Sequence, residues 1–391
     1  MLNGTFYNPT IFFFGSNAES KIGEEIAKYS HKILLHYGKS SFKKYGLYNK
    51  IISSLKAAGV DYLEFSEVQP NPRASLVYEG ISLCRKENID FILAVGGGSV
   101  IDSAKAISIG VPYEGDFFDF FLGKDYPKKA LKLATVLTLP GTGSESNSIA
   151  VITHQERGQK KSCANPLMFP VFSVLNPELT TTLNPYNTAC GIVDAISHVL
   201  ERYFTNTTYV DCTDRICEGL IKTLIEYARL VKVDPNNYQV RAEIMWAAKL
   251  AHDNTAGFGR KQDWATHGIS HEIGVRQDMA HGAIIGVIFP AWMKYVYKTN
   301  VTRFIQFASR VFDIDTALIL PEQAILIAIE KFQQFLKSID MPTTLCELGI
   351  KDNSQFVEIA QASVLYMPSG TIGNFQRLSS QDIVKILEIA S

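Results

Sequence analysis

The first half of the chain alternates short apolar runs with longer segments whose apolar residues recur every three to four positions. The runs end at glycine, proline or asparagine and predict strands, and the longer segments predict amphipathic helices. Predicted strands cover residues 31–37, 62–68, 91–95, 135–139, 149–153 and 171–175, after two short strands around Asn8-Pro9 within residues 4–14. Predicted helices cover residues 17–29, 47–58, 74–87 and 100–109, and a basic turn is expected at 157–161. This alternation favours a mostly parallel sheet with helices on both faces.

The pattern changes after Asn176-Pro177, where helical periodicity replaces the alternation. Predicted helices cover residues 186–203, 211–232, 238–256, 264–274, 282–298, 300–311, 322–338, 353–367 and 380–390. Because hardly any strand-like run interrupts them, we expect two domains. Residues 1–178 form a doubly wound α/β domain of the Rossmann-like type, and residues 179–391 form an all-helical domain.

Composition narrows the class of protein. The chain has 391 residues, of which 46% are apolar and 20% charged, and its net charge is −1. This balance argues against nucleic acid or an anionic membrane as the main partner. The six cysteines form no C-x-x-C pair, and the most apolar stretch, residues 283–293, is too short to span a bilayer. No signal peptide is visible, so we expect a protein of the reducing cytoplasm.

Glycine-rich turns follow several of the predicted strands. Gly96-Gly97-Gly98-Ser99 follows the strand at 91–95 and precedes a helix, which lets backbone N–H groups and the helix N-terminus approach a phosphate. The run is not G-x-G-x-x-G, because Ile101 stands at the third glycine position. A tight strand–helix turn without a ligand would explain it as well. However, Gly38, Asn71 and the segment 138–143 also follow strands, and ligands of open α/β sheets bind at that edge, so a dinucleotide is expected.

The turn after the second strand bears on which dinucleotide binds. Dinucleotide sites commonly place an acid there for the ribose 2′-hydroxyl. Here the turn contains Lys39, Ser40, Lys43 and Lys44 and no acid. Cations and hydroxyls suit a 2′-phosphate, so NADP(H) is preferred over NAD(H). The alternative is that these lysines are simply a solvated surface.

Two pairs of possible metal ligands with helical spacing, one Asp/His and one His/His, lie in the second half. Asp194 and His198 are four residues apart, as are His267 and His271, and His281-Gly282 follows. On a helix, each pair projects from one face. A carboxylate with imidazoles suits one divalent ion such as Fe²⁺ or Zn²⁺, and also Ni²⁺ or Mn²⁺. Each pair alone is more often a surface or capping pair. Spacing does not choose among His267, His271 and His281.

Together these motifs resemble the iron-containing (group III) alcohol dehydrogenases, in particular the NADP-dependent butanol dehydrogenase and aldehyde reductase branch. The resemblance covers essentially the whole chain and implies a dehydroquinate synthase-like architecture. It rests on four motifs: Gly96-Gly-Gly-Ser99-x-x-Asp102-x-x-Lys105, Thr138-x-x-Gly-Thr-Gly-Ser-Glu145, Asp194-x3-His198 and His267-x3-His271-x9-His281-Gly282.

The resemblance implies roles for individual residues. Asp194, His198, His267 and His281 would bind the metal, and His271 would lie beside it in the substrate pocket, as a proton relay or simply as a pocket histidine. The expected cofactor-binding residues, including Lys39 from the argument above, are Gly38, Lys39, Ser40, Asn71, Gly96, Gly97, Gly98, Ser99, Asp102, Thr138, Thr142 and Lys160.

The expected activity is metal-assisted, reversible hydride transfer between NADP(H) and a small primary alcohol or aldehyde such as butanol or butanal. Aldehyde reduction is the expected direction in the cell. A polyol dehydrogenase or a sugar-phosphate cyclase or lyase of the same fold is the alternative, and a nucleotide-binding regulator is a third class. A cyclase would need basic residues for substrate phosphate, whereas Phe258, Trp264, Phe289 and Trp292 lie near the predicted metal helices.

The apolar N-terminal segment, residues 5–14, bears on assembly. Left exposed, such a strand would be prone to aggregation, so we expect it either to dock on its own sheet or to pair with the same segment of a second subunit. The resemblance favours the second, and hence a homodimer through the N-terminal strands.

Overall fold

The structure is a computed structural model that describes residues 1–39, 41–44, 46–365, 367 and 369–391. Contacts between residues divide the chain into two compact units. We call residues 7–183 with 236–245 the sheet unit, and residues 1–6, 184–235 and 246–391 the helical unit. The chain thus passes between units at residues 183/184, five residues after the expected boundary, and residues 1–6 belong with the helices rather than with the sheet.

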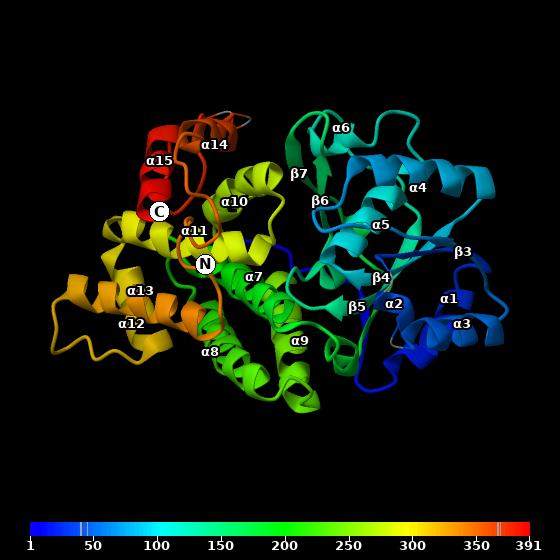
Figure 1. The fold of residues 1–391 in the computed structure, drawn as a ribbon, viewed down its shortest axis with the longest axis horizontal. Coiled ribbons are helices and arrows are strands. Elements are labelled where there is room, and N and C mark those ends of the chain that lie inside the picture. The colour runs from blue at the N-terminus through cyan, green and yellow to red at the C-terminus, as the bar shows by residue number, and fades with distance from the viewer. Residues whose placement is uncertain (40, 45, 366, 368) are drawn as a thin grey trace. The chain divides into compact units, whose positions relative to one another are not determined.

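A six-stranded sheet forms the centre of the sheet unit (Figure 1). Its strand order is β1-β8-β5-β4-β2-β3. Its strands are β1 (Ile11–Phe14), β2 (Lys32–Tyr37), β3 (Asp61–Phe65), β4 (Phe91–Gly97), β5 (Lys132–Leu139) and β8 (Phe172–Leu175). All five neighbouring pairs are parallel, which confirms the predicted parallel sheet. The carboxyl ends of the strands therefore lie along one edge.

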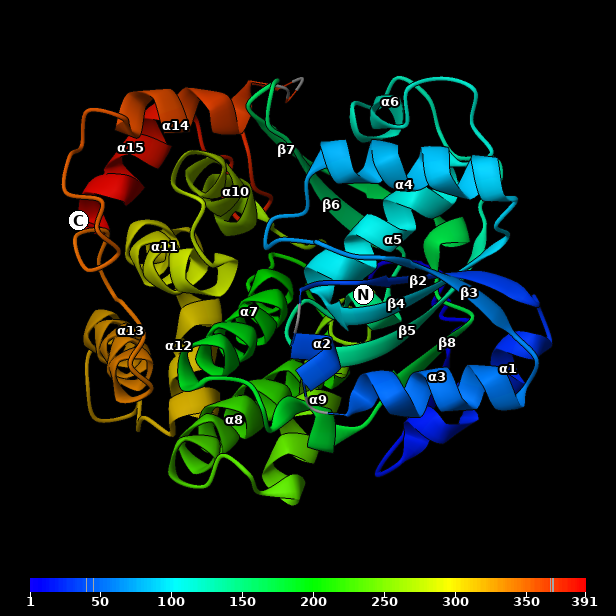
Figure 2. The ribbon, with the colours of Figure 1, turned by 45° about the vertical axis from the view of Figure 1, so that its right-hand side comes forward.

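Helices cover both faces of this sheet (Figure 2). They are α1 (Ile22–Ala27), α2 (Ser41–Lys44), α3 (Leu47–Ala57), α4 (Ala74–Glu87), α5 (Gly98–Gly110) and α6 (Phe118–Phe121). Alternate residues of β2 point to opposite faces. Ile33 and Leu35 are buried in the cluster that contains α3, and Leu34 is buried in the cluster that contains α4 and α5. Two apolar cores, one on each face, therefore position the sheet between its helices.

A hairpin of two antiparallel strands, β6 (Ile149–His154) and β7 (Gln159–Ala164), forms a separate small sheet, and β6 packs against α5. The prediction of a basic turn at 157–161 was right only in part. The turn covers residues 155–158, whereas Lys160 and Lys161 lie within β7 and pair with Thr153 and Ile152. Only Lys160 and Cys163 of β7 are buried, and one of them is a lysine, so its sequence carries little of the hydrophobicity that marks a strand.

Of the two short strands predicted within residues 4–14, only the second is present. Only Ile11–Phe14 forms a strand, and residues 1–10 have no regular secondary structure. Asn8 explains part of this difference, because its side chain accepts a hydrogen bond from the backbone of Thr10 and donates one to the carbonyl of Ser146. Pro9 has no N–H to contribute to a strand ladder.

The helical unit contains α7 (Pro185–Tyr203), α8 (Asp211–Val233), α10 (Ala265–Gln277), α11 (His281–Val296), α12 (Val301–Phe312), α13 (Pro321–Ser338), α14 (Phe356–Val364) and α15 (Ser380–Ile389). Helix α9 (Tyr238–His252) begins in the sheet unit and ends in the helical unit. Short 3-10 helices are η1 (Ala18–Lys21), η2 (Ser144–Ser146), η3 (Pro166–Met168), η4 (Pro177–Thr180) and η5 (Tyr297–Thr299). No helix within the described residues is long and apolar enough to cross a membrane.

An aromatic cluster fills the core of the helical unit. The ring of Phe204, at the end of α7, lies against a group of other buried rings: Phe289, Trp292, Phe304, Phe307 and Phe375. Phe289 and Trp292 are almost completely buried there. These two rings, which the sequence placed among aromatic residues near the metal helices, therefore serve packing of the core.

Candidate metal centre and cofactor edge

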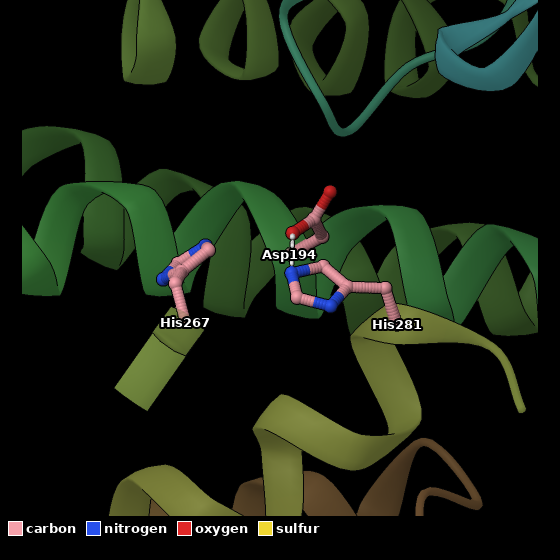
Figure 3. Close-up of side chains that lie close together, drawn as sticks. All are labelled: Asp194, His267 and His281. Carbon is pink, nitrogen blue, oxygen red and sulfur yellow. Dashed lines mark ion pairs between the residues drawn. The ribbon is translucent and has the colours of Figure 1, made fainter. Parts of the chain in front are cut away.

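Three side chains from three segments of the helical unit converge on one point (Figure 3). They are Asp194 of α7, His267 of α10 and His281 at the start of α11, and one ligand atom of each lies within 4.8 Å of the others. The Oδ1 atom of Asp194 is 3.6 Å from Nε2 of His281. A single ion with ligand bonds of about 2.1 Å needs ligand atoms roughly 3–4 Å apart, so modest side-chain movement would close this group around a metal.

The spacing of residues on α7 explains how the carboxylate faces the imidazoles. The helix begins after Asn184, whose side chain accepts a hydrogen bond from the N–H of Asn187. Asp194 and His198 are one turn apart on the helix, and Nε2 of His198 is 3.7 Å from Oδ1 of Asp194. Both side chains are buried.

Helix α11 reaches this group because its second residue is a glycine. A Cβ atom on Gly282 would lie 2.0 Å from the carbonyl oxygen of Cys190, on the turn of α7 that precedes Asp194. The backbones of α7 and α11 therefore touch, and this contact holds His281 beside Asp194.

His198 lies in a stack of imidazoles outside the tightest group. Its ring centroid is 4.0 Å from that of His252 and 4.8 Å from that of His267. Burial, together with the neighbouring histidines, holds the pKa of His198 well below its usual value. The ring is therefore neutral at physiological pH, which is the protonation state that a metal ligand needs. Its Nδ1 has no hydrogen-bond partner among the residues that the structure describes.

The structure bears on the choice that spacing left open between His267, His271 and His281. His267 and His281 join Asp194, whereas the half-buried ring of His271 lies beside His281, with 5.3 Å between the ring centroids. A buried carboxylate and imidazoles in this arrangement fit a divalent transition metal.

Sequence reasoning did not identify Glu201, which contacts this site directly. Its side chain is fully buried, and its Oε1 lies 2.8 Å from Nδ1 of His267. Burial raises the pKa of Glu201 to about 7, while hydrogen bonds from Thr266 and from the N–H groups of His267 and Trp264 act in the opposite direction. The signal in the sequence was its position three residues after His198, which places both residues on one side of α7.

In the sheet unit, the glycine-rich turn connects β4 directly to α5, which begins at Gly98. A Cβ atom on Gly98 would lie 2.3 Å from Oγ1 of Thr142, and one on Gly96 would lie 2.5 Å from Cγ2 of Val100. Packing alone thus requires glycine at both positions. The same packing places Thr142 against the N-terminus of α5, at the carboxyl edge of the sheet where ligands of such sheets bind.

Asp102 and Lys105 fasten α5 to the segment that follows β5. Asp102 accepts hydrogen bonds from the hydroxyl of Ser144 at 2.6 Å and from the N–H of Val151 at 3.0 Å. The fully buried ammonium group of Lys105 donates to oxygens of Ser144, Asn147 and Ile149. Both side chains thus hold together the two segments that carry the predicted cofactor residues Ser99, Thr138 and Thr142.

The remaining predicted cofactor residues follow β2 and β3, except Lys160, which lies within β7. Lys39 is exposed and Gly38 is half-buried, and Ser40 lies outside the described residues. Lys160 is buried and lies 2.8 Å from Oδ1 of Asn71, to which it donates a hydrogen bond. The structure therefore places Lys160 and Asn71 together and leaves Lys39 with its charge facing solvent.

An acid does lie near the turn after β2, although the turn itself contains none. Glu64 of β3 forms an ion pair with Lys43 at 2.7 Å and also accepts hydrogen bonds from Tyr37 and Tyr48. Burial opposes its ionisation, but these hydrogen bonds hold the pKa of Glu64 at about 2. The charge of Lys43 is therefore already balanced, whereas the exposed Lys39 remains a candidate for binding a 2′-phosphate.

Comparison with known proteins identifies the family. A parallel α/β unit with a glycine-rich turn, followed by helices that carry an aspartate–histidine cluster, fits a metal- and nucleotide-dependent enzyme. The family model described as iron-containing alcohol dehydrogenase matches residues 9–177, and the model of the family's C-terminal region matches residues 188–391. The chain belongs to the iron-containing alcohol dehydrogenase family, as its motifs indicated.

Individual relatives agree with this assignment over nearly the full length. The chain is 40% identical to the probable NADH-dependent butanol dehydrogenase 1 of Bacillus subtilis, with 99% of each chain covered. It is 36% identical to the NADPH-dependent aldehyde reductase YqhD of Escherichia coli, with 90% of this chain and 91% of the relative covered. The crystal structure of NADH-dependent butanol dehydrogenase A from Thermotoga maritima superimposes with a TM-score of 0.96 at 38% identity, covering 100% of this chain and 99% of the other.

These findings confirm the fold class and the predicted enzyme class. The protein is an alcohol dehydrogenase that interconverts alcohols and aldehydes, and its family implies a divalent metal and a nicotinamide nucleotide. The relatives divide on the nucleotide, since their names include both NADH-dependent and NADPH-dependent enzymes.

Proposed function

We propose that this enzyme transfers hydride between NADP(H) and a small primary alcohol or aldehyde of the butanol and butanal type, and that it reduces aldehydes in the cell. The observation that carries the proposal is the convergence of Asp194, His267 and His281. The names of the relatives, which include butanol dehydrogenases and an aldehyde reductase, support the substrate class. The six cysteines of this chain form no disulfide with one another, which supports a cytoplasmic location.

We assign the metal to Asp194, His198, His267 and His281, with Fe²⁺ or Zn²⁺ preferred over Ni²⁺ or Mn²⁺. A divalent ion bound there supplies Lewis acidity, which stabilises negative charge on a substrate oxygen. The side chain of His271, beside His281 and half-buried, is the proposed proton relay to solvent. The polypeptide orients the reactants, and the nucleotide carries the hydride.

The nucleotide preference rests on Lys39, whose exposed cation follows β2 at the carboxyl edge of the sheet. A cation at this position favours the additional 2′-phosphate of NADP(H). The proposed cofactor residues are otherwise those of the glycine-rich turn, together with Asn71, Thr138, Thr142 and Lys160.

Turnover with butanal tests the proposal. Purified protein should oxidise NADPH only when butanal is present, chelation should abolish this activity, and Fe²⁺ or Zn²⁺ should restore it. The His267→Ala variant should lose both bound metal and turnover, while the control His31→Ala, at an exposed position in the sheet unit, should keep both. A full complement of metal in His267→Ala would remove His267 from the ligand set. Turnover of a polyol but not of butanal would favour the polyol dehydrogenase alternative.

We also propose that the enzyme is a homodimer whose subunits meet at β1, the strand at the end of the sheet order. The exposed apolar side chains of Ile11 and Phe14 on this strand support an interface there.

A further inference from the structure

We infer that Glu201 is a positioning residue that fixes the orientation and the tautomer of His267, so that Nε2 of this imidazole faces the metal. The inference rests on the metal site of the proposed function. It adds a residue outside the ligand set, with a role that can be measured without substrate or nucleotide.

The carboxylate of Glu201 is enclosed by donors. Its Oε1 accepts from the hydroxyl of Thr266 at 2.5 Å, from the backbone N–H of His267 at 3.1 Å and from Nδ1 of the same residue at 2.8 Å. Its Oε2 accepts from the N–H of Trp264 at 2.6 Å. The side chain is fully buried, so solvent does not compete for these bonds.

The chemistry of these partners determines which nitrogen of His267 carries the proton. The backbone N–H groups of Trp264 and His267 are donors at every pH, so both oxygens of Glu201 serve as acceptors. The ionised carboxylate has no proton to donate, so with it Nδ1 donates to Oε1, and the neutral ring is left with its lone pair on Nε2. A hydrogen bond from the other ring nitrogen to a carboxylate is the arrangement that raises the basicity of a metal-binding histidine.

Glu201 also links two of the helices that carry ligands. It belongs to α7, which carries Asp194 and His198, and it accepts hydrogen bonds at the first turn of α10, which carries His267. A carboxylate is stabilised at a helix N-terminus by the helix dipole. The same contact therefore joins the two helices and directs the imidazole toward Asp194.

Zn²⁺ affinity tests the positioning role. In Glu201→Gln the shape of the side chain is kept, but its amide N–H₂ group must face donors, so the imidazole loses its fixed orientation. We expect Zn²⁺ to bind about 10- to 100-fold more weakly than to the wild type, measured by competition with a chelator. The matched control is Thr266→Val, which removes one donor to Oε1 and leaves Nδ1 of His267 in place. Its affinity should stay within about threefold of the wild type.

A purely structural role predicts a different result. If Glu201 only caps α10, then both variants should lower the melting temperature of the metal-free protein while Zn²⁺ affinity stays unchanged. Equal affinity of wild type and Glu201→Gln would therefore overturn the positioning role alone. A wild-type protein that does not bind Zn²⁺ would overturn the metal site itself, and the positioning role with it.

The tautomer of His267 can also be measured directly, which keeps the inference testable if Glu201→Gln does not fold. In metal-free wild-type protein labelled with ¹⁵N-histidine, the nitrogen shifts of His267 at pH 8 should show the proton on Nδ1. A proton on Nε2 would contradict the inference.

Discussion

At the scale of single residues, Lys39 is the side chain on which the nucleotide preference depends. Replacing it in Lys39→Asp puts a negative charge where the 2′-phosphate is proposed to bind. A charged contact to phosphate contributes about 1.5–3 kcal/mol, so the affinity for NADPH should fall by about 10- to 150-fold, whereas NADH should be less affected. The measurement is the ratio of kcat/KM for NADPH and NADH.

The matched control for this change is Lys132→Asp. Lys132 is also exposed, but it begins β5 and so lies at the opposite edge of the sheet. The Lys132→Asp variant should leave the ratio of kcat/KM for NADPH and NADH unchanged. If Lys39→Asp also leaves it unchanged, the 2′-phosphate binds elsewhere, for example near Lys160.

His36 is a buried residue whose protonation affects stability. Nδ1 of His36 lies 2.9 Å from the carbonyl oxygen of Phe65, and Nε2 lies 2.9 Å from the hydroxyl of Ser103. Because a carbonyl only accepts, the proton is on Nδ1 and the ring is neutral. Burial lowers the pKa of this side chain to about 4.

The unfolded chain therefore binds a proton at His36 at a higher pH than the folded chain does. Stability from this residue is fully present above pH about 6.5 and is lost as the pH falls toward about 4. Between pH 7.5 and 5 the loss should amount to about 2 kcal/mol. His36→Asn, whose amide can still donate to Phe65, should lack this loss when urea unfolding is compared at the two pH values. The control His31→Asn, at an exposed position, should lose stability between the two pH values as the wild type does.

The sequence could identify those site residues whose roles follow from their spacing along the chain. Asp194, His267 and His281 stand in recognisable motifs, and the structure brings them together. Spacing alone left His271 as an equal candidate, because it does not determine how α10 is rotated against α7. Glu201 escaped notice for a similar reason, since its partner is the N-terminus of a helix far along the chain.

At the scale of helices and strands, Gly282 determines how closely α11 approaches α7. In Gly282→Ala the new Cβ would meet the backbone of Cys190 at 2.0 Å, and backbone cannot move aside as a flexible side chain can. The helices must separate, which should destabilise the protein by about 1–3 kcal/mol and weaken Zn²⁺ binding, because His281 moves with α11. Urea unfolding and chelator competition measure the two effects.

Gly219→Ala serves as the control for a glycine in a helix. Gly219 is exposed on α8, and a Cβ there would have nothing within 4 Å. Alanine should stabilise the helix by about 0.5–1 kcal/mol without any effect on Zn²⁺. Gly282→Ala with unchanged Zn²⁺ affinity would show that the contact between α7 and α11 does not position His281.

Elements marked by strong hydrophobic periodicity were predictable, and those without it were not. Helix α4 spans residues 74–87, as predicted, because its apolar residues recur at helical spacing between clear turn signals. Strand β7 went unrecognised because pairing with β6, rather than burial of apolar side chains, defines it. The prediction for the segment before β1 erred in the opposite direction. Its apolar residues suggested a strand that the structure does not contain.

At the scale of the whole molecule, the change of pattern near residue 178 indicated two units but not their composition. Residues 1–6 precede the sheet unit in the sequence but belong to the helical unit. Residues 236–245 lie between two segments of the helical unit but belong to the sheet unit. A single boundary along the chain cannot represent such exchanges, because they depend on which residues pack together after folding.

Assembly is also a property of the whole molecule, and β1 is where it can be tested. The strand pairs with β8 on one side and stands last in the sheet order, and 51% of the surface of Ile11 is exposed. A lysine on an edge strand opposes pairing with a second chain, because it would carry its charge into the interface. Ile11→Lys should therefore shift the proposed homodimer toward monomer, as measured by light scattering at micromolar concentration.

Leu326→Lys is the matched control, since Leu326 is 43% exposed on helix α13 of the helical unit. It introduces the same charge at an exposed apolar position away from β1 and should leave the dimer intact. Dissociation by both variants would indicate a general effect of added charge rather than an interface at β1. A wild-type protein that is already monomeric under these conditions would refute the dimer, because the exposed apolar residues of β1 would then be tolerated in solution without a partner.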